Sequence, residues 1–209
     1  MLKITNKQID LDRSEILYEK PFSKASLMED FEISGGTWTV EEGWLTGLFR
    51  ENAGALVYLK KEFPGDILLD FIGRTVPPCD NDLNFTFKTK GWDYEKNDAD
   101  RGYIGGLGGW WDNKAGIEHY PQCTPWASTE LLKLESGKEY HIQTGSIGDH
   151  CFLIVDGVIV TELYDPNAEE FKDCHRVGLG SYCSHVQFRD FKVIRPYWEK
   201  TSFVYTPKF

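Results

Sequence analysis

The sequence has no long apolar segment. Its first twenty residues, MLKITNKQIDLDRSEILYEK, contain no apolar stretch followed by a small-residue cleavage site, and nothing later approaches the ~18 apolar residues of a membrane-spanning helix. We therefore expect a cytoplasmic protein without a membrane partner. The mature form of an exported protein, with its signal peptide removed, would fit the same residues.

Basic residues are in the minority. Lys and Arg number 23 against 33 Asp and Glu, so the formal net charge is −10. A field of this sign repels phosphate backbones and anionic lipid, which excludes nucleic acid as an expected partner. The oligomeric state stays open.

Paired cysteines and metal motifs are also missing. The five cysteines are widely spaced with no Cys-x-x-Cys pair, so neither a disulfide framework nor a zinc knuckle is expected. Two acidic turns, CDND at 79–82 and NDAD at 97–100, contain oxygen ligands that calcium accepts, but neither has the spacing of a calcium loop. Solvated turns explain them as well. We predict no metal site, and calcium is the one cofactor left open.

Helical periodicity is weak, whereas short apolar runs separated by turn residues are frequent. The segment TWTVEEGWLTGLF predicts a hairpin that turns at Glu42-Gly43, and CFLIVDGVIVTEL predicts another at Asp156-Gly157. With 41% hydrophobic residues, one continuous core is expected, and we treat residues 1–209 as a single domain.

Three further segments have a readable pattern. The run ILLDFIGRT predicts a strand buried on both faces. DLNFTFKTK alternates, so that Asn84 shares a face with Thr86 and Lys88 that opens to solvent or to a groove. HVQFRDFKVIRP changes phase near Arg189 and Asp190, which one bulge explains. The segment at 167–173 favours one helical turn.

Together these patterns predict an all-β jelly-roll sandwich of two antiparallel sheets. The segments GTWTVEEGWLTG, GKEYHIQTGSIGDHCFLIVDGVIV and RVGLGSYCSHVQFRDFKVIRP resemble, in that order, the framework of small bacterial concanavalin A-like proteins of the YesU-like group. Keto-disaccharide hydrolase-type domains are a more distant likeness. The resemblance covers about residues 17–196. It implies a concanavalin A-like fold whose concave groove receives a saccharide, in the breakdown of plant or microbial glycans.

The resemblance supplies no catalytic motif. Glucanases of this fold place alternate carboxylates of a Glu-x-Asp-x-Glu strand in the groove, and that pattern is missing here. Motifs of zinc proteases, P-loop nucleotide hydrolases and serine hydrolases are missing too. Whether the protein is an enzyme is therefore left open.

The segment GLGGWWDNKAGIEHYP, residues 106–121, supplies the main candidates. Consecutive strand residues face opposite ways, so Glu118 and Tyr120 share one face and His119 lies on the other. His119 is either a base at the groove margin, with Tyr120 as proton partner, or a histidine hydrogen-bonded within the structure. Trp110 and Trp111 divide in the same way between the core and a sugar-stacking surface.

Other candidates come from elsewhere in the chain. Arg74 ends a buried strand and would pair with the carboxylate of an acidic sugar. His175, Tyr182 and His185 flank the last strands, where a histidine pair with His119 could form. Trp126 is a further stacking candidate. The predicted catalytic set is thus His119, Tyr120, His175 and His185, and the predicted substrate-binding set is Trp110, Trp111, Arg74, Asn84, Glu118 and Tyr182.

Three functions fit these residues. The leading hypothesis is a carbohydrate-active protein that binds a saccharide in the groove and cleaves a glycosidic linkage, by hydrolysis or elimination. The second is a glycan-binding module without catalysis, for which the aromatics suffice. The third is an accessory subunit that packs its aromatics against a partner enzyme.

Overall fold

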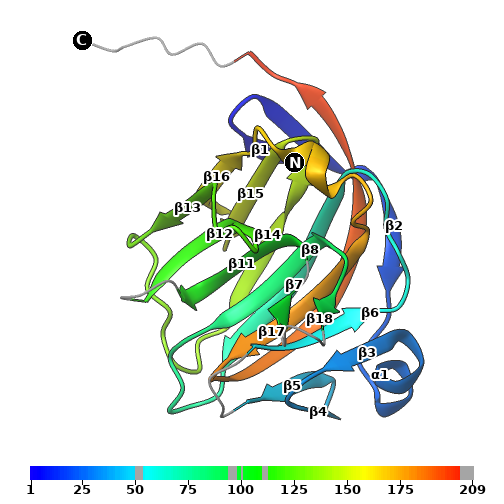
Figure 1. Ribbon diagram of the computed structural model, residues 1–209, viewed down its shortest axis with the longest axis vertical. Helices are drawn as coiled ribbons and strands as arrows, with labels where there is room; N and C mark the ends of the chain where they lie inside the picture. Colours follow the sequence, from blue (N-terminus) through cyan, green and yellow to red (C-terminus); the bar gives the residue numbers. More distant parts are fainter. Residues whose placement is uncertain (50–53, 94–97, 100, 110–112, 203–209) are drawn as a thin grey trace.

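The computed structural model describes residues 1–49, 54–93, 98–99, 101–109 and 113–202. Over these residues the chain forms two antiparallel sheets stacked face to face (Figure 1), which confirms the predicted all-β sandwich. Two short helical segments accompany the sheets there, α1 (Lys24–Asp30) and the 3-10 turn η1 (Ala168–Phe171). Within the described residues no helix has the length and apolar character needed to cross a membrane.

The first sheet contains nine of the described strands. Its main path runs β1-β2-β18-β7-β14-β15-β16, while β5 pairs with β18 and β4 pairs with β5. The bounds are β1 (Leu2–Ile4), β2 (Lys7–Glu19), β4 (Thr37–Glu41), β5 (Trp44–Leu48), β7 (Ile67–Thr75), β14 (Tyr140–Ile147), β15 (His150–Val155), β16 (Val158–Tyr164) and β18 (His185–Lys200).

The second sheet contains seven strands in the order β13-β12-β11-β8-β17-β6-β3. They are β3 (Phe31–Ser34), β6 (Gly54–Leu59), β8 (Leu83–Thr89), β11 (Gly102–Gly109), β12 (Lys114–Tyr120), β13 (Trp126–Thr129) and β17 (Arg176–Tyr182). A small ribbon of β9 (Trp92–Asp93) and β10 (Asp98–Ala99) lies between β8 and β11 in the chain.

The predicted local features are present. β4 and β5 turn at Glu42-Gly43, and β15 and β16 turn at Asp156-Gly157, with positive φ at all four turn residues as a tight hairpin requires. The phase change in β18 is a bulge at Asp190, whose φ is 55°. The helical turn at 167–173 is η1.

The nine-stranded sheet is buried on both faces over part of its area. Leu68 and Leu69 are neighbours on β7 and so point to opposite faces, yet neither is exposed. Leu69 belongs to the core between the sheets, where Phe71 of β7 meets Phe85 of β8 at a ring separation of 5.9 Å. Leu68 belongs to a second core on the outer face, whose buried members are Ile4, Ile9, Leu68, Ile147, Phe152, Ile154 and Ile194.

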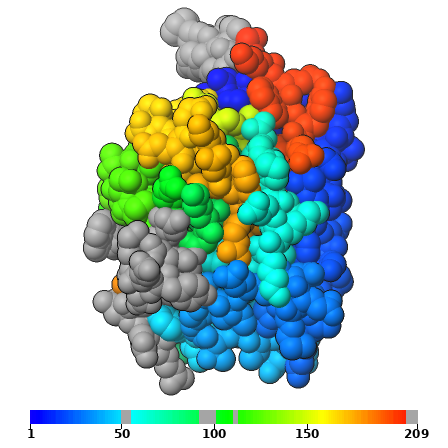
Figure 2. All heavy atoms as spheres, turned by 45° about the vertical axis from the view of Figure 1, so that its right-hand side comes forward, coloured from blue at the N-terminus to red at the C-terminus, as the bar shows by residue number. Residues whose placement is uncertain are grey.

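The second core is covered because the nine-stranded sheet curls. The curl brings the β1–β2 hairpin at one edge of the sheet to β16 at the other edge. The backbone N–H and hydroxyl of Thr5, in the β1–β2 turn, donate to Glu162 of β16 at 2.8 and 2.6 Å. His150 of β15 contacts the same carboxylate at 3.0 Å, and the ammonium of Lys7 lies 3.2 Å from the other nitrogen of that ring. Figure 2 shows the N-terminal residues in blue beside the red end of β18.

Glu162 is the acceptor on which this closure converges. Burial alone would raise its pKa, but hydrogen bonds from His150 and Thr5 outweigh burial and hold the pKa at about 2, below the ordinary 4.5. A carboxyl with a depressed pKa in the folded state stabilises the fold above its unfolded pKa. That contribution disappears as the pH falls from about 4.5 through 2.

We predict that Glu162→Gln lowers the free energy of unfolding by on the order of 2 kcal/mol at pH 7, because the amide keeps the shape and loses the charge that three donors solvate. Urea titrations of both proteins at pH 7 and pH 2.5 measure the difference, which should shrink at the lower pH. Glu41→Gln, at an exposed position of β4, is the control. A loss that does not depend on pH would contradict the assignment.

Candidate functional site

The outer face of the seven-stranded sheet has a row of glycines across its middle. Strand register places six residues side by side along this row, one from each of six neighbouring strands: Leu56, Gly180, Asn84, Gly106, Gly116 and Ser128. We call these six residues the glycine row. Half of the row has no side chain, so the row is lower than the face on either side of it.

The glycines are required by the side chains beside them. A Cβ on Gly180 would lie 2.8 Å from Cδ2 of Leu56, and a Cβ on Gly106 would collide with Oδ1 of Asn84. Leu56 and Asn84 therefore lie flat along the sheet, and the amide of Asn84 stays half-buried at the surface. The result is a flat floor in which Leu56 and the three glycines are buried, Asn84 is half-buried and Ser128 is exposed.

Two further rows border the floor. On one side, register aligns Tyr58, Gly178, Thr86, Ile104, Glu118 and Trp126. Trp126 ends this row with 45% of its surface exposed, while Ile104 and Glu118 are half-buried. On the other side lie Asp82, Gly109, Lys114 and Glu130, where the last two form an ion pair of 3.4 Å.

Asp82 is the most perturbed carboxyl of this face. It precedes β8 with a positive φ of 49°, its backbone N–H donates to the carbonyl of Gly108 at 3.3 Å, and its carboxylate accepts hydrogen bonds from Asn81 and Asn84. Burial raises its pKa from the ordinary 3.8 to about 6, against the opposing effect of those two amides. A carboxyl kept in a position that disfavours its charge is a functional-site candidate.

His119 lies between the sheets. Only 2% of its surface is exposed, and its Nδ1 lies 2.6 Å from the carboxylate of Asp165, which also accepts from the hydroxyl of Tyr103 at 2.8 Å. The ring of Phe171 in η1 covers it at 4.3 Å. Its Nε2 faces Glu170 at 3.7 Å. The arrangement joins β11, β12 and the segment after β16 through one buried carboxylate.

The other predicted site residues lie in several places. Asn84, Glu118, Tyr120 and Tyr182 share the outer face of the seven-stranded sheet with Asp82 and Trp126. His185 begins β18 opposite Leu48, and its N–H lies 3.4 Å from the sulfur of Cys79. Trp110 and Trp111 lie outside the described residues. The predicted residues are thus not gathered in one groove.

Arg74 is on the opposite side of the sandwich, on the outer face of the nine-stranded sheet. Its guanidinium contacts Glu139 at 3.1 Å and Gln187 at 2.9 Å, and it lies 4.0 Å from the ring centre of Trp44. Arg189 holds the other oxygen of Glu139 at 2.7 Å. Arg74, which was predicted to bind the carboxylate of an acidic sugar, thus forms an ion pair with Glu139 of the protein itself.

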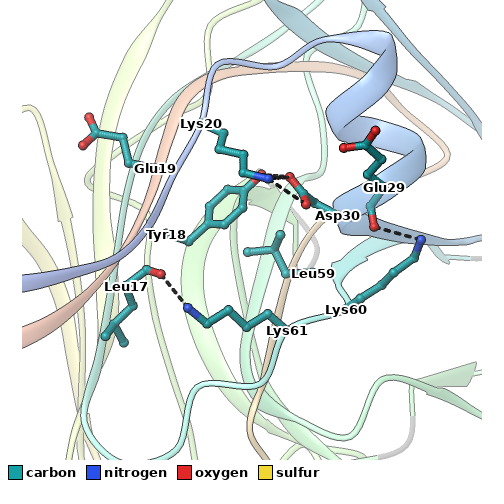
Figure 3. Close-up of a pocket in the computed structure, with 9 residues that line it drawn as sticks. All are labelled: Leu17, Tyr18, Glu19, Lys20, Glu29, Asp30, Leu59, Lys60 and Lys61. Carbon is teal, nitrogen blue, oxygen red and sulfur yellow. Dashed lines mark hydrogen bonds and ion pairs between the residues drawn. The ribbon is translucent and has the colours of Figure 1, made fainter.

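Two of the pockets lined by described residues lie outside the glycine row. One of about 560 Å³ lies at the rim of the sandwich and includes His175, Lys88, Asp165 and Phe171. The other, of about 490 Å³, is shown in Figure 3 and includes Lys20, Lys60 and Lys61.

The lysines of the second pocket already have acceptors. Lys20 donates to Asp30, Lys60 to the carbonyls of Met28 and Glu29, and Lys61 to the carbonyl of Leu17. These contacts tie α1 and β6 to β2, so this pocket is a structural junction.

The possible calcium ligands named from the sequence lie in the two acidic turns at 79–82 and 97–100. Among the residues that the structure describes, no group of three or more His, Cys, Asp or Glu side chains is placed to hold a metal ion. Within the 79–82 turn, Asn81 donates to Asp82 at 3.2 Å. Part of the 97–100 turn lies outside the described residues.

Sequence reasoning missed Asp82 as a single residue, since it treated CDND as an acidic turn. It also missed the glycine row. The signal was present in VGLGSY, where Gly178 and Gly180 are two residues apart and must share a face of the strand. Nothing in the sequence alone pairs those glycines with Gly106 and Gly116, which come from another part of the chain.

Comparison with known proteins shows the fold and no family. No family model and no curated sequence matches the chain. A Bacillus subtilis protein of unknown function with a galectin-like fold is 11% identical, with 88% of this chain and 98% of that one covered and a TM-score of 0.67. The carbohydrate-binding module CBM66 of Bacillus subtilis is 14% identical over 78% of this chain and 94% of its own, at a TM-score of 0.58.

A third similar structure is the carbohydrate recognition domain of Emp46p in its potassium-bound form, which is 13% identical over 82% of this chain and 91% of its own, at a TM-score of 0.60. These likenesses agree with the two stacked sheets described above. The chain has a galectin-like jelly-roll fold, which is the fold class that the sequence predicted.

We predict that Asp82→Asn stabilises the protein at pH 8 by about 1–2 kcal/mol. The pKa of Asp82 is raised on folding, so its ionisation destabilises the fold as the pH rises from about 4 to 6, and the amide removes that effect. Urea unfolding of both proteins at pH 4 and pH 8 tests this, with Asp80→Asn, at an exposed neighbouring position, as control. A gain of equal size at pH 4 would contradict it.

Proposed function

We propose that this protein binds a saccharide on the outer face of its seven-stranded sheet, along the glycine row. The observation that carries the proposal is the combination of a flat floor with fixed polar groups and the exposed ring of Trp126. Asn84 lies within the floor with Asp82 beside it, and Trp126 lies three strands away on β13. Saccharides need this combination, because hydroxyls seek hydrogen-bond partners while the C–H faces of the rings pack on indole.

The polar groups suit hydroxyl recognition. An ionised Asp82 accepts hydrogen bonds only, and the amide of Asn84 both donates and accepts. The two side chains already hydrogen-bond each other, so their orientations are set before a ligand arrives. Preorganisation of this kind lowers the entropy lost on binding.

The names of two similar structures agree with the proposal, although the proposal rests on the geometry of the face. CBM66 is named a carbohydrate-binding module, and the Emp46p domain is named a carbohydrate recognition domain. The finer expectation, glycan breakdown in the manner of YesU-like or keto-disaccharide hydrolase-type proteins, stays a prediction. Cleavage by His119 also stays a prediction, and any such role must expose a ring that now lies beneath Phe171.

We predict that Trp126→Ala weakens binding to the best ligand on an array of immobilised neutral glycans by about tenfold, because an aromatic contact of this type contributes ~1 kcal/mol beyond its buried area. Isothermal titration calorimetry measures the change. Leu131→Ala is the control, since Leu131 is 96% exposed and lies just beyond β13. If no glycan binds the unmodified protein, the proposal is wrong and the accessory-subunit hypothesis takes its place.

We also predict that binding strengthens as the pH rises through about 6, because Asp82 then becomes an acceptor-only carboxylate. Asp82→Asn should weaken binding and remove this pH dependence while it stabilises the fold, so loss of affinity cannot be attributed to unfolding. Titrations at pH 5 and pH 8 are sufficient. Unchanged affinity in the variant would exclude Asp82 from the site.

The same titrations test catalysis. Chromatography of the saccharide recovered after prolonged incubation shows whether it is intact. Intact ligand supports a binding module, whereas shortened products that disappear in His119→Gln would establish the catalytic role predicted from the sequence.

A further inference from the structure

The two ends of the proposed site are too far apart for one sugar ring. Asp82 immediately precedes β8, Asn84 lies near the beginning of β8, and Trp126 begins β13, with β11 and β12 between β8 and β13. Three inter-strand steps of ~4.8 Å separate β8 from β13 by about 14 Å. A ligand that touches both ends must extend across the strands.

The floor between the ends is continuous. Gly106 and Gly116 face each other across β11 and β12, and Ser128 continues the row on β13. Ile104 and Glu118 border this floor as half-buried side chains in one neighbouring row. An extended chain can therefore lie along the row at right angles to the strands without crossing a bulky side chain of the row itself.

Among the described residues that border this path, acidic side chains outnumber basic ones. Asp82 and Glu118 lie on opposite sides of the floor, and Lys114 is already paired with Glu130 at 3.4 Å. An anionic sugar would meet two carboxylates, while the pair of guanidiniums suited to a uronate, Arg74 and Arg189, lies on the other face of the sandwich around Glu139. The path therefore suits an uncharged chain.

From this geometry we infer that the ligand is an uncharged, unbranched oligosaccharide of at least three units, bound lengthwise from Asp82 and Asn84 to Trp126. This inference rests on the proposed function and adds the ligand's length, direction and charge. Each linked pyranose advances about one inter-strand spacing, so three or four units fill the distance. Trp126 then contacts only the far end of the chain.

The test is the dependence of affinity on chain length. Cello-, xylo- and malto-oligosaccharides of one to six units are titrated into the unmodified protein by calorimetry at pH 8. In the series that binds, affinity should rise at least tenfold from one unit to four and then level off. Galacturonate oligomers of the same lengths should bind at least tenfold more weakly.

Two variants locate the ends. Trp126→Ala should remove the gain between two and four units and leave the affinity for one unit within twofold, whereas Asp82→Asn should weaken every length by a similar factor. Leu131→Ala should change neither. A single unit that binds as tightly as four, an equal loss at all lengths in Trp126→Ala, or tighter binding of the galacturonate series would each overturn the inference.

The failure of the inference and of the proposed function are distinct results. If short and long chains bind equally, a saccharide site exists but does not extend to Trp126. If no chain of any length or charge binds, and the glycan array is also negative, the saccharide function itself is excluded.

Discussion

The architecture depends on a constraint imposed by three neighbouring strands of the nine-stranded sheet. β7, β14 and β15 carry apolar residues on both faces, so one packed layer cannot cover them. The sheet meets this constraint by curling, until the β1–β2 turn hydrogen-bonds to β16 and encloses a second core. That core occupies part of the outer face of this sheet. The candidate site lies on the outer face of the seven-stranded sheet, where Asn84 and Glu118 are half-buried and Trp126 is exposed.

Two carboxyls show how stability and function are separated in this molecule. Glu162 is held ionised by donors that join the ends of a sheet, and its low pKa is a measure of what it contributes to the fold. The pKa of Asp82 is shifted in the opposite direction, because burial disfavours the charged form of its carboxyl. A residue that lowers stability at neutral pH, with no strand or hairpin that depends on its charge, is more readily explained by ligand binding than by folding.

The sequence predicted the local structure well where the chemistry is local. Asp156-Gly157 and Glu42-Gly43 specify their hairpins through two residues of positive φ, and the phase change around Asp190 specifies a bulge. Alternation correctly placed Asn84 on an outward face and Glu118 with Tyr120 on the face opposite His119. It did not specify which outward face, and Arg74 proved to lie on the opposite side of the sandwich from Asn84. The face on which a residue lies depends on the strand order, which pairs β8 with β17 across about a hundred residues of sequence. The periodicity of the sequence does not specify such a pairing.

Histidine was the least informative residue for function. Three of the five histidines contact a carboxylate of another element: His119 with Asp165, His141 with Asp70, and His150 with Glu162. In each pair an imidazole nitrogen lies within hydrogen-bond distance of the carboxylate. A catalytic histidine is oriented in the same way, so the pair itself does not distinguish a structural histidine from a catalytic one. The distinction lies at the second ring nitrogen. In His150 that nitrogen contacts Lys7 at 3.2 Å, and in His119 it lies 3.7 Å from Glu170, beyond hydrogen-bond distance. Both histidines link separate segments of the fold, and the proposed saccharide site depends instead on the acidic, amide and aromatic side chains on the outer face of the seven-stranded sheet.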